Sequence, residues 1–126
     1  MSILRVDNFG PSAGGTTYSA GGIAKAWVNF NGTGTVAIRD SLNGSSLVDN
    51  GTGYQDVNLI SAMNTSQDYS TIACCSFDGD AGQTNKTGIV EVLPLTSSKY
   101  SQSVWNTANS YFDNLFNSSS VHGDLA

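Results

Sequence analysis

The chain has 126 residues, of which 39% are hydrophobic and 12% charged, with a formal net charge of −5. This length predicts a single domain, and the five scattered basic residues exclude the positive patch that binds nucleic acid or an anionic membrane. Ser, Thr, Asn and Gly fill 55 positions, and because 10% of the residues are aromatic we expect an ordered, turn-rich all-β chain. No run approaches the ~18 apolar residues of a membrane span, so membrane insertion is not expected.

Residues 1–22 are predicted to form an extended leader with little core of its own. The segment contains "GPSAGG" and "SAGG", which are rich in residues that interrupt regular structure. Its first residues, "MSILRVDNFG", lack the apolar centre of a secretory signal, so export by that route is not expected. Residues 23–126 are then assigned to one folded domain.

The strongest hairpin signal lies in "AKAWVNFNGTGTVAIRD" at 24–40. Apolar Ala26, Val28 and Phe30 share one face of a predicted strand with one buried face, and the residues between them share the other. Within "NGTG" at 31–34, Asn31 and Gly32 are the residues expected to adopt positive φ in a tight turn, and "TVAIR" at 35–39 alternates again. The pattern predicts two antiparallel strands joined at 31–34.

The same four residues recur at 50–53, between "SSLVD" and "YQDVNLI". Val57 and Leu59 share one face of the second strand, and "NGSS" at 43–46 adds a turn between the two hairpins. Four short strands at this spacing predict an antiparallel β-sandwich or a barrel-like domain built from consecutive hairpins.

Two further strands are predicted at 69–77 and 88–95, separated by the polar stretch "DGDAGQTNKT". Pro94 cannot donate a ladder hydrogen bond, so it favours an edge or a strand end. Cys74 and Cys75 are neighbours in the first of these strands and should point to opposite faces, which disfavours a disulfide between them.

The segment from 104 to 116 gives conflicting signals. Val104, Ala108, Tyr111, Leu115 and related apolar residues fit helical spacing. The intervening Asn, Ser and Thr residues are poor helix formers. The residues alone leave two structures open here, a helix or a strand, loop and strand.

Carboxylates around the polar stretch raise two kinds of chemistry, a calcium loop and a glycosidase pair. Asp78 and Asp80 begin like an EF-hand loop, but Gly82 and Ile89 stand where that loop needs ligands. With Glu91 they could form a glycosidase pair, but the sequence does not place them at the ~5–10 Å separation this reaction uses. A solvated loop is the favoured interpretation.

The single histidine, His122, lies in "VHGDLA" near the end of the chain. Serine is abundant, but no "GxSxG" motif accompanies the histidine, so we assign it to a strand surface or a subunit contact rather than to catalysis. One histidine and two adjacent cysteines give no metal-ligand pattern. We therefore expect no catalytic residue, no metal and no cofactor.

The remaining candidates are aromatic. Rings that are exposed beside amides and carboxylates can stack on sugar faces while the polar groups bond hydroxyls. Trp27 and Phe30 are instead expected to fill the core or a subunit contact. The candidate receptor-binding residues are Trp105, Tyr111, Phe112, Tyr54, Asp78 and Asp80.

The chain also resembles a known family through "AKAWVNFNGTGTVAIRDSLNGSSLVDNGTG" at 24–53, "VNLISAM" at 57–63 and the final "VHGDLA". With the start "MSILRVDNF", these stretches resemble short tail-fibre or fibre-like structural proteins of marine bacteriophages, of the kind that infect cyanobacteria and pelagic bacteria. Gly44 departs from the pattern, where an apolar strand residue is expected, and so does "YQD" at 54–56.

The resemblance implies a non-enzymatic virion protein, a short tail fibre or fibre tip that attaches to the host surface, where a glycan is the candidate receptor. It implies a homotrimer, a leader at 1–22 that contacts other virion proteins, and a last strand entering 121–124, which favours strand, loop and strand over 104–116. A head-fibre, decoration or neck protein without receptor binding is the alternative. A carbohydrate-active enzyme or soluble lectin is a third account.

Overall fold

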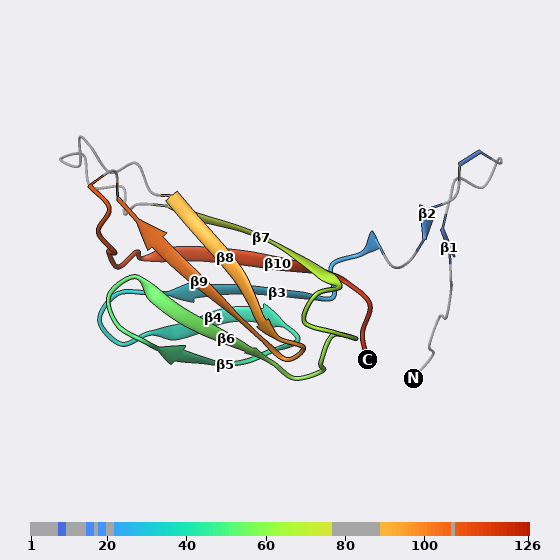
Figure 1. Ribbon diagram of the computed structural model, residues 1–126, viewed down its shortest axis with the longest axis horizontal. Helices are drawn as coiled ribbons and strands as arrows, with labels where there is room; N and C mark the ends of the chain where they lie inside the picture. Colours follow the sequence, from blue (N-terminus) through green and yellow to red (C-terminus); the bar gives the residue numbers. More distant parts are fainter. Residues whose placement is uncertain (1–7, 10–14, 17, 20–21, 77–88, 107) are drawn as a thin grey trace.

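The computed structural model describes residues 8–9, 15–16, 18–19, 22–76, 89–106 and 108–126. In these residues the protein is all-β, and two four-stranded antiparallel sheets pack face to face (Figure 1), which confirms the expected β-sandwich. The strands are β1 (Asn8–Phe9), β2 (Tyr18–Ser19), β3 (Ala26–Asn31), β4 (Ala37–Leu42), β5 (Gly44–Asp49), β6 (Tyr54–Leu59), β7 (Tyr69–Ser76), β8 (Ile89–Thr96), β9 (Lys99–Trp105) and β10 (Phe116–Gly123).

Both expected hairpins are confirmed, but they belong to different sheets. The strand pair β3–β4 lies in the first sheet, of order β4-β3-β10-β7, and the pair β5–β6 lies in the second, of order β5-β6-β9-β8. Asn43, with φ of 60°, is the single residue between β4 and β5. A Cβ on Gly44 would approach Val28 Cγ2 to 2.7 Å, which explains why no apolar side chain stands there.

The first turn uses its residues differently from the expectation. Positive φ falls on Gly34, at 60°, and not on Asn31 or Gly32. The Asn31 side chain instead closes the turn, because its Oδ1 accepts from Thr33 N at 3.2 Å and its Nδ2 donates to Thr33 O at 2.7 Å. In the second turn, by contrast, positive φ occurs at both Gly51 and Gly53.

The strands expected at 69–77 and 88–95 are present as β7 and β8. As expected for a strand that contains Pro94, β8 lies at the edge of the second sheet, and its register shifts between Pro94 and Thr96. Cys74 and Cys75 are both free, with Cys74 exposed and Cys75 half-buried, and burial raises the pKa of the Cys75 thiol.

The helical alternative for 104–116 is wrong. β9 ends at Trp105, β10 begins at Phe116, and the described residues between them form turns, an isolated bridge and irregular backbone. The full extent of β9 was not anticipated from the sequence. Tyr100, Gln102 and Val104 face the core with period two, but serines fill the alternate positions and weaken the apolar signal.

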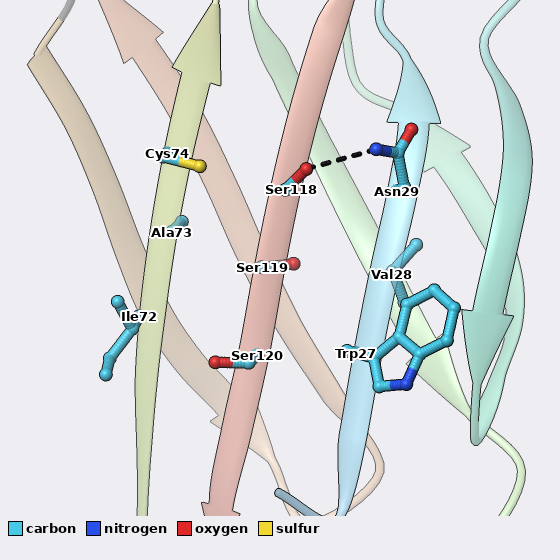
Figure 2. A pocket seen from close by; sticks show the side chains of 9 residues that line it. All are labelled: Trp27, Val28, Asn29, Ile72, Ala73, Cys74, Ser118, Ser119 and Ser120. Atoms are coloured by element: carbon cyan, nitrogen blue, oxygen red, sulfur yellow. Dashed lines mark hydrogen bonds between the residues drawn. The ribbon is translucent and has the colours of Figure 1, made fainter.

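Trp27 does not fill the core. It is 37% exposed on the outer face of the first sheet, because its neighbours Ala26 and Val28 point inward and side chains alternate along β3. Figure 2 shows Trp27 on β3 and Ile72 on β7 on either side of the small serines of β10. Phe30 is fully buried in the core, as expected, whereas for Trp27 the expected subunit contact stays a prediction.

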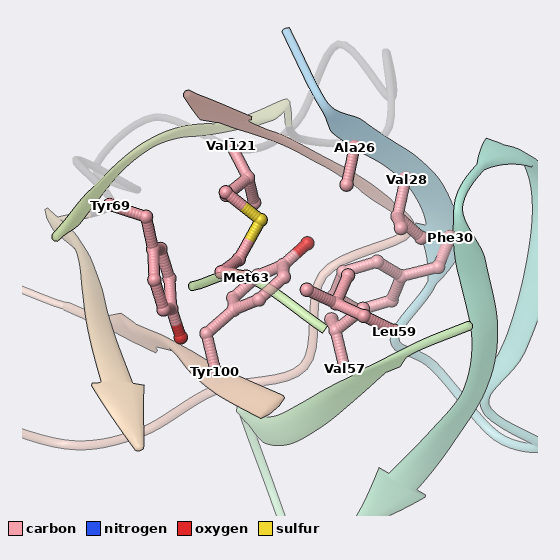
Figure 3. Packing of buried hydrophobic residues seen from close by; sticks show 9 residues of the cluster. All are labelled: Ala26, Val28, Phe30, Val57, Leu59, Met63, Tyr69, Tyr100 and Val121. Atoms are coloured by element: carbon pink, nitrogen blue, oxygen red, sulfur yellow. The ribbon is translucent and has the colours of Figure 1, made fainter. Parts of the chain in front are cut away.

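The core lies between the sheets and includes Met63 from the segment after β6. The hydroxyl groups of Tyr100 and Ser119 form a hydrogen bond of 2.7 Å between the two sheets. The Tyr69 hydroxyl lies within hydrogen-bonding distance of the Thr96 and Lys99 carbonyl oxygens, at 2.9 and 3.0 Å. Figure 3 shows how the two tyrosine rings enter the same apolar space as the aliphatic side chains. The cluster consists of Ala26, Val28, Phe30, Val57, Leu59, Met63, Tyr69, Tyr100 and Val121.

The expected leader falls largely outside the described residues. Within it, β1 and β2 form a separate two-stranded antiparallel sheet, with Asn8 opposite Ser19. Both large sheets are built from residues that follow Gly22. Among the described residues, no helix has the length and apolar character needed to cross a membrane.

Candidate functional site

Three aromatic rings form a cluster on the outer face of the second sheet, near one end of the sandwich. The Tyr111 ring contacts the Trp105 ring, with centroids 3.8 Å apart and an interplanar angle of 37°. It also stacks on Tyr54, at 6.1 Å and 20°. Tyr111 is 42% exposed, so part of the cluster faces water. We call Tyr54, Trp105 and Tyr111 the aromatic cluster.

A tight loop after β9 brings Tyr111 back onto Trp105. Asn106 Oδ1 accepts from the backbone N–H groups of Ala108 and Ser110, at 2.9 and 3.0 Å, and Asn109 adopts a φ of 59°. The chain then reverses, so that Trp105 and Tyr111 form an antiparallel bridge. Asn suits both positions, because its side chain forms hydrogen bonds to nearby backbone and its backbone tolerates a left-handed φ.

The two "NGTG" turns hold the residues after this loop. They lie at the same end of the sandwich as the segment that leads into β10 (Figure 1). Gly32 N donates to Asn114 O at 2.9 Å, and Gly53 N donates to Asp113 Oδ1 at 2.7 Å. A Cβ at Gly53 would meet Phe112 O at 2.5 Å, so only glycine permits this approach. The repeated motif thus positions the segment that carries Tyr111.

Two hollows border the aromatic cluster. Ser103 on β9 pairs with Tyr54 on β6 on one side and with Glu91 on β8 on the other. The serine is small, so a hollow of about 200 Å³ remains between the rings and β8, lined by Tyr54, Glu91, Leu93, Ser101, Ser103 and Tyr111. A second hollow of about 570 Å³ is lined by Ile89, Val90, Glu91, Trp105 and Asn109.

A short chain of hydrogen bonds links the cluster to the carboxylate. Trp105 Nε1 donates to Ser103 Oγ at 3.0 Å, and Ser103 Oγ donates to Glu91 Oε2 at 3.5 Å. In the adjacent row Asp56, which is nearly buried, forms an ion pair with Lys99 at 3.0 Å. The site therefore combines one exposed ring, Tyr111, and two half-buried rings with one carboxylate and neutral hydroxyls.

Of the six residues expected to bind a receptor, the structure brings three together, Tyr54, Trp105 and Tyr111. Phe112 is half-buried and lines neither hollow, although its backbone N–H donates to Val104 O at 3.1 Å. Asp78 and Asp80 lie outside the described residues. Ser101 and Ser103 were missed, and the period-two pattern of β9 is the signal that would have placed them on the outer face.

A further groove lies on the outer face of the first sheet. Its volume is about 310 Å³, and Trp27, Ile72, Cys74 and the serines of β10 are among its lining residues (Figure 2). Asn29 Nδ2 donates to Ser118 Oγ across it at 3.2 Å. The single aromatic ring in this groove, Trp27, has no stacking partner among its described lining residues.

His122 lies at the end of β10, consistent with its assignment to a strand surface. Its Nε2 is 3.4 Å from Ser120 Oγ, and its Nδ1 is 3.3 Å from the backbone carbonyl oxygen of Gly22. A catalytic histidine is usually oriented by a carboxylate, and here a backbone carbonyl takes that position. In the described part of the chain, no three His, Cys, Asp or Glu side chains gather as a metal site.

Comparison with protein-family models, with curated proteins and with solved structures finds no match to this chain.

Proposed function

We propose that this protein is a non-enzymatic component of a bacteriophage particle, a short tail fibre or fibre tip, that attaches to a glycan on the host surface. The single observation that supports attachment is the aromatic cluster, in which Tyr111 contacts Trp105 and Tyr54 at an exposed position beside Glu91. Rings of this kind stack on the C–H faces of sugars, while carboxylates and hydroxyls bond the sugar hydroxyls. The resemblance of residues 24–63 to fibre proteins supports the virion setting.

We further propose that the protein assembles as a homotrimer, with the leader at 1–22 contacting other virion proteins. The resemblance to fibre proteins motivates both proposals. A chain of 126 residues also buries a smaller share of its surface than a larger domain does, so added burial between subunits would stabilise it.

The test of attachment removes one ring at a time. Tyr111→Ala and Trp105→Ala should weaken binding of the protein to a panel of immobilised bacterial surface polysaccharides. A stacked, water-exposed ring contributes about 1–2 kcal/mol, which corresponds to a loss of about 5- to 30-fold in affinity. Thermal melting of each variant is measured beside binding, because truncation of a buried ring would instead cost about 3–5 kcal/mol of stability.

Trp27→Ala is the matched control for Trp105→Ala, since Trp27 is a tryptophan with 37% exposure that lies on the outer face of the other sheet. Binding should survive this change. Equal loss in Trp27→Ala and Tyr111→Ala, or unchanged binding in both cluster variants, would contradict the assignment of the site.

A further inference from the structure

Glu91 lies where the two hollows meet. It lines the hollow beside Tyr54 and Tyr111, and it also lines the hollow beside Ile89 and Trp105. Its side chain is exposed on the edge strand β8 and stands opposite Ser103. A saccharide that contacts the aromatic cluster from either hollow therefore approaches this carboxylate.

The hydrogen-bond chain directs one carboxylate oxygen of Glu91 towards Ser103. Ser103 Oγ accepts from Trp105 Nε1 and donates to Glu91 Oε2, so both the indole and the carboxylate are tied to the floor of the hollow. An ionised carboxylate is purely an acceptor, with room for about four hydrogen bonds on its two oxygens. Glu91 thus retains acceptor capacity on its exposed side for a pair of neighbouring sugar hydroxyls.

The charge of the site points in the same direction. Among the described residues that line the two hollows, Glu91 is the one charged side chain. The nearby Asp56 is paired with Lys99 at 3.0 Å, so that pair adds little net charge. A carboxylate or sulfate on a bound sugar would meet the Glu91 charge at close range without a cation among these lining residues.

We propose that Glu91 makes the site selective for uncharged glycans with adjacent hydroxyl groups, and that it disfavours glycans carrying uronate or sulfate groups. This inference rests on the proposed glycan-binding function and adds the class of ligand. Glu91 is the specificity-determining residue, and the aromatic cluster supplies the contact that is common to both classes.

The experiment compares matched ligands. Each polysaccharide of the panel is presented in its native anionic form and after carboxyl reduction or desulfation. The wild-type protein should bind the uncharged member of a pair about fivefold or more tightly, from like-charge repulsion at close range in water. Glu91→Gln should bring this preference close to one. It should also weaken binding of the uncharged member by about five- to tenfold, because a charged acceptor is replaced by a neutral one.

Asp124→Asn is the control, because it removes the same charge from an exposed position two residues before the C-terminus. Figure 1 shows the C-terminus at the opposite end of the sandwich from the "NGTG" turns. This variant should leave the preference unchanged. The inference about Glu91 is overturned if the wild-type protein prefers the anionic members, or if the preference is unchanged in Glu91→Gln. In either case, binding that still depends on Tyr111 upholds the proposed function. Absence of binding to every member of the panel overturns the proposed function itself.

Discussion

The two copies of "NGTG" offer a paired test of how the turns support the site. Gly34 and Gly53 occupy the same position in the two copies, and both have positive φ, at 60° and 63°. Their surroundings differ. A Cβ at Gly34 would have nothing within 4 Å, whereas a Cβ at Gly53 would meet Phe112 O at 2.5 Å and Phe112 N at 2.6 Å.

The difference in free energy of unfolding follows from these surroundings. Alanine in the left-handed region costs about 1 kcal/mol, and this applies to Gly34→Ala and Gly53→Ala alike. At Gly53 the backbone of Phe112 must also move. Three hydrogen bonds are then strained or lost, Gly53 N to Asp113 Oδ1, Val104 N to Gly53 O and Phe112 N to Val104 O. At about 1 kcal/mol each, they raise the expected cost of Gly53→Ala to about 4 kcal/mol.

Urea denaturation measures both variants. With a slope of about 2 kcal/mol per molar, the midpoint should fall by about 0.5 M for Gly34→Ala and about 2 M for Gly53→Ala. Gly53→Ala should also reduce glycan binding at temperatures where it remains folded, because Tyr111 lies on the displaced segment. Equal midpoints for the two variants would refute the reasoning that the contact with Phe112 requires glycine.

Three other predictions concern the core, the thiols and the assembly. Burial raises the pKa of Tyr100 to about 12, so its neutral hydroxyl contributes fully to the free energy of unfolding below pH 10, and this contribution should be lost as pH rises from 10 towards 12. The loss approaches about 3 kcal/mol, and urea midpoints of Tyr100→Phe, measured over the same range, should show a smaller decline. Iodoacetamide should modify the exposed Cys74, tested alone in Cys75→Ser, faster than it modifies Cys75, tested alone in Cys74→Ser, because burial raises the pKa of the Cys75 thiol. Mass spectrometry measures both rates, and equal rates would contradict this expectation. Light scattering should give about three times the 13.2 kDa chain mass, and a stable monomer at micromolar concentration would count against the trimer.

Part of the candidate site could be predicted from residue types alone. Trp105, Tyr111 and Tyr54 were expected to bind a receptor, because exposed rings beside polar residues suit sugars. The sequence did not show that Phe112, adjacent to Tyr111, would be half-buried and line neither hollow. Nor did it indicate that Glu91, fourteen positions before Trp105, would share a hollow with that ring. The position of Phe112 depends on its backbone contacts with Gly53 and Val104, and that of Glu91 depends on the register of β8 against β9.

Local patterns determined the β-sandwich and its first two hairpins. Alternation from Ala26 to Phe30 and the Asn-Gly turns act over a few residues, so they remain legible in the sequence. The segment 104–116 was different, because helical spacing and poor helix propensity disagreed locally. Tertiary structure decided it: Asn117 pairs with Phe30 on one side and Cys75 on the other, so β10 completes the first sheet. Such partners are distant in sequence, and only folding brings them together. In the second sheet, the pairing of β6 and β8 with β9 likewise places Tyr54 and Glu91 at one hollow with Tyr111.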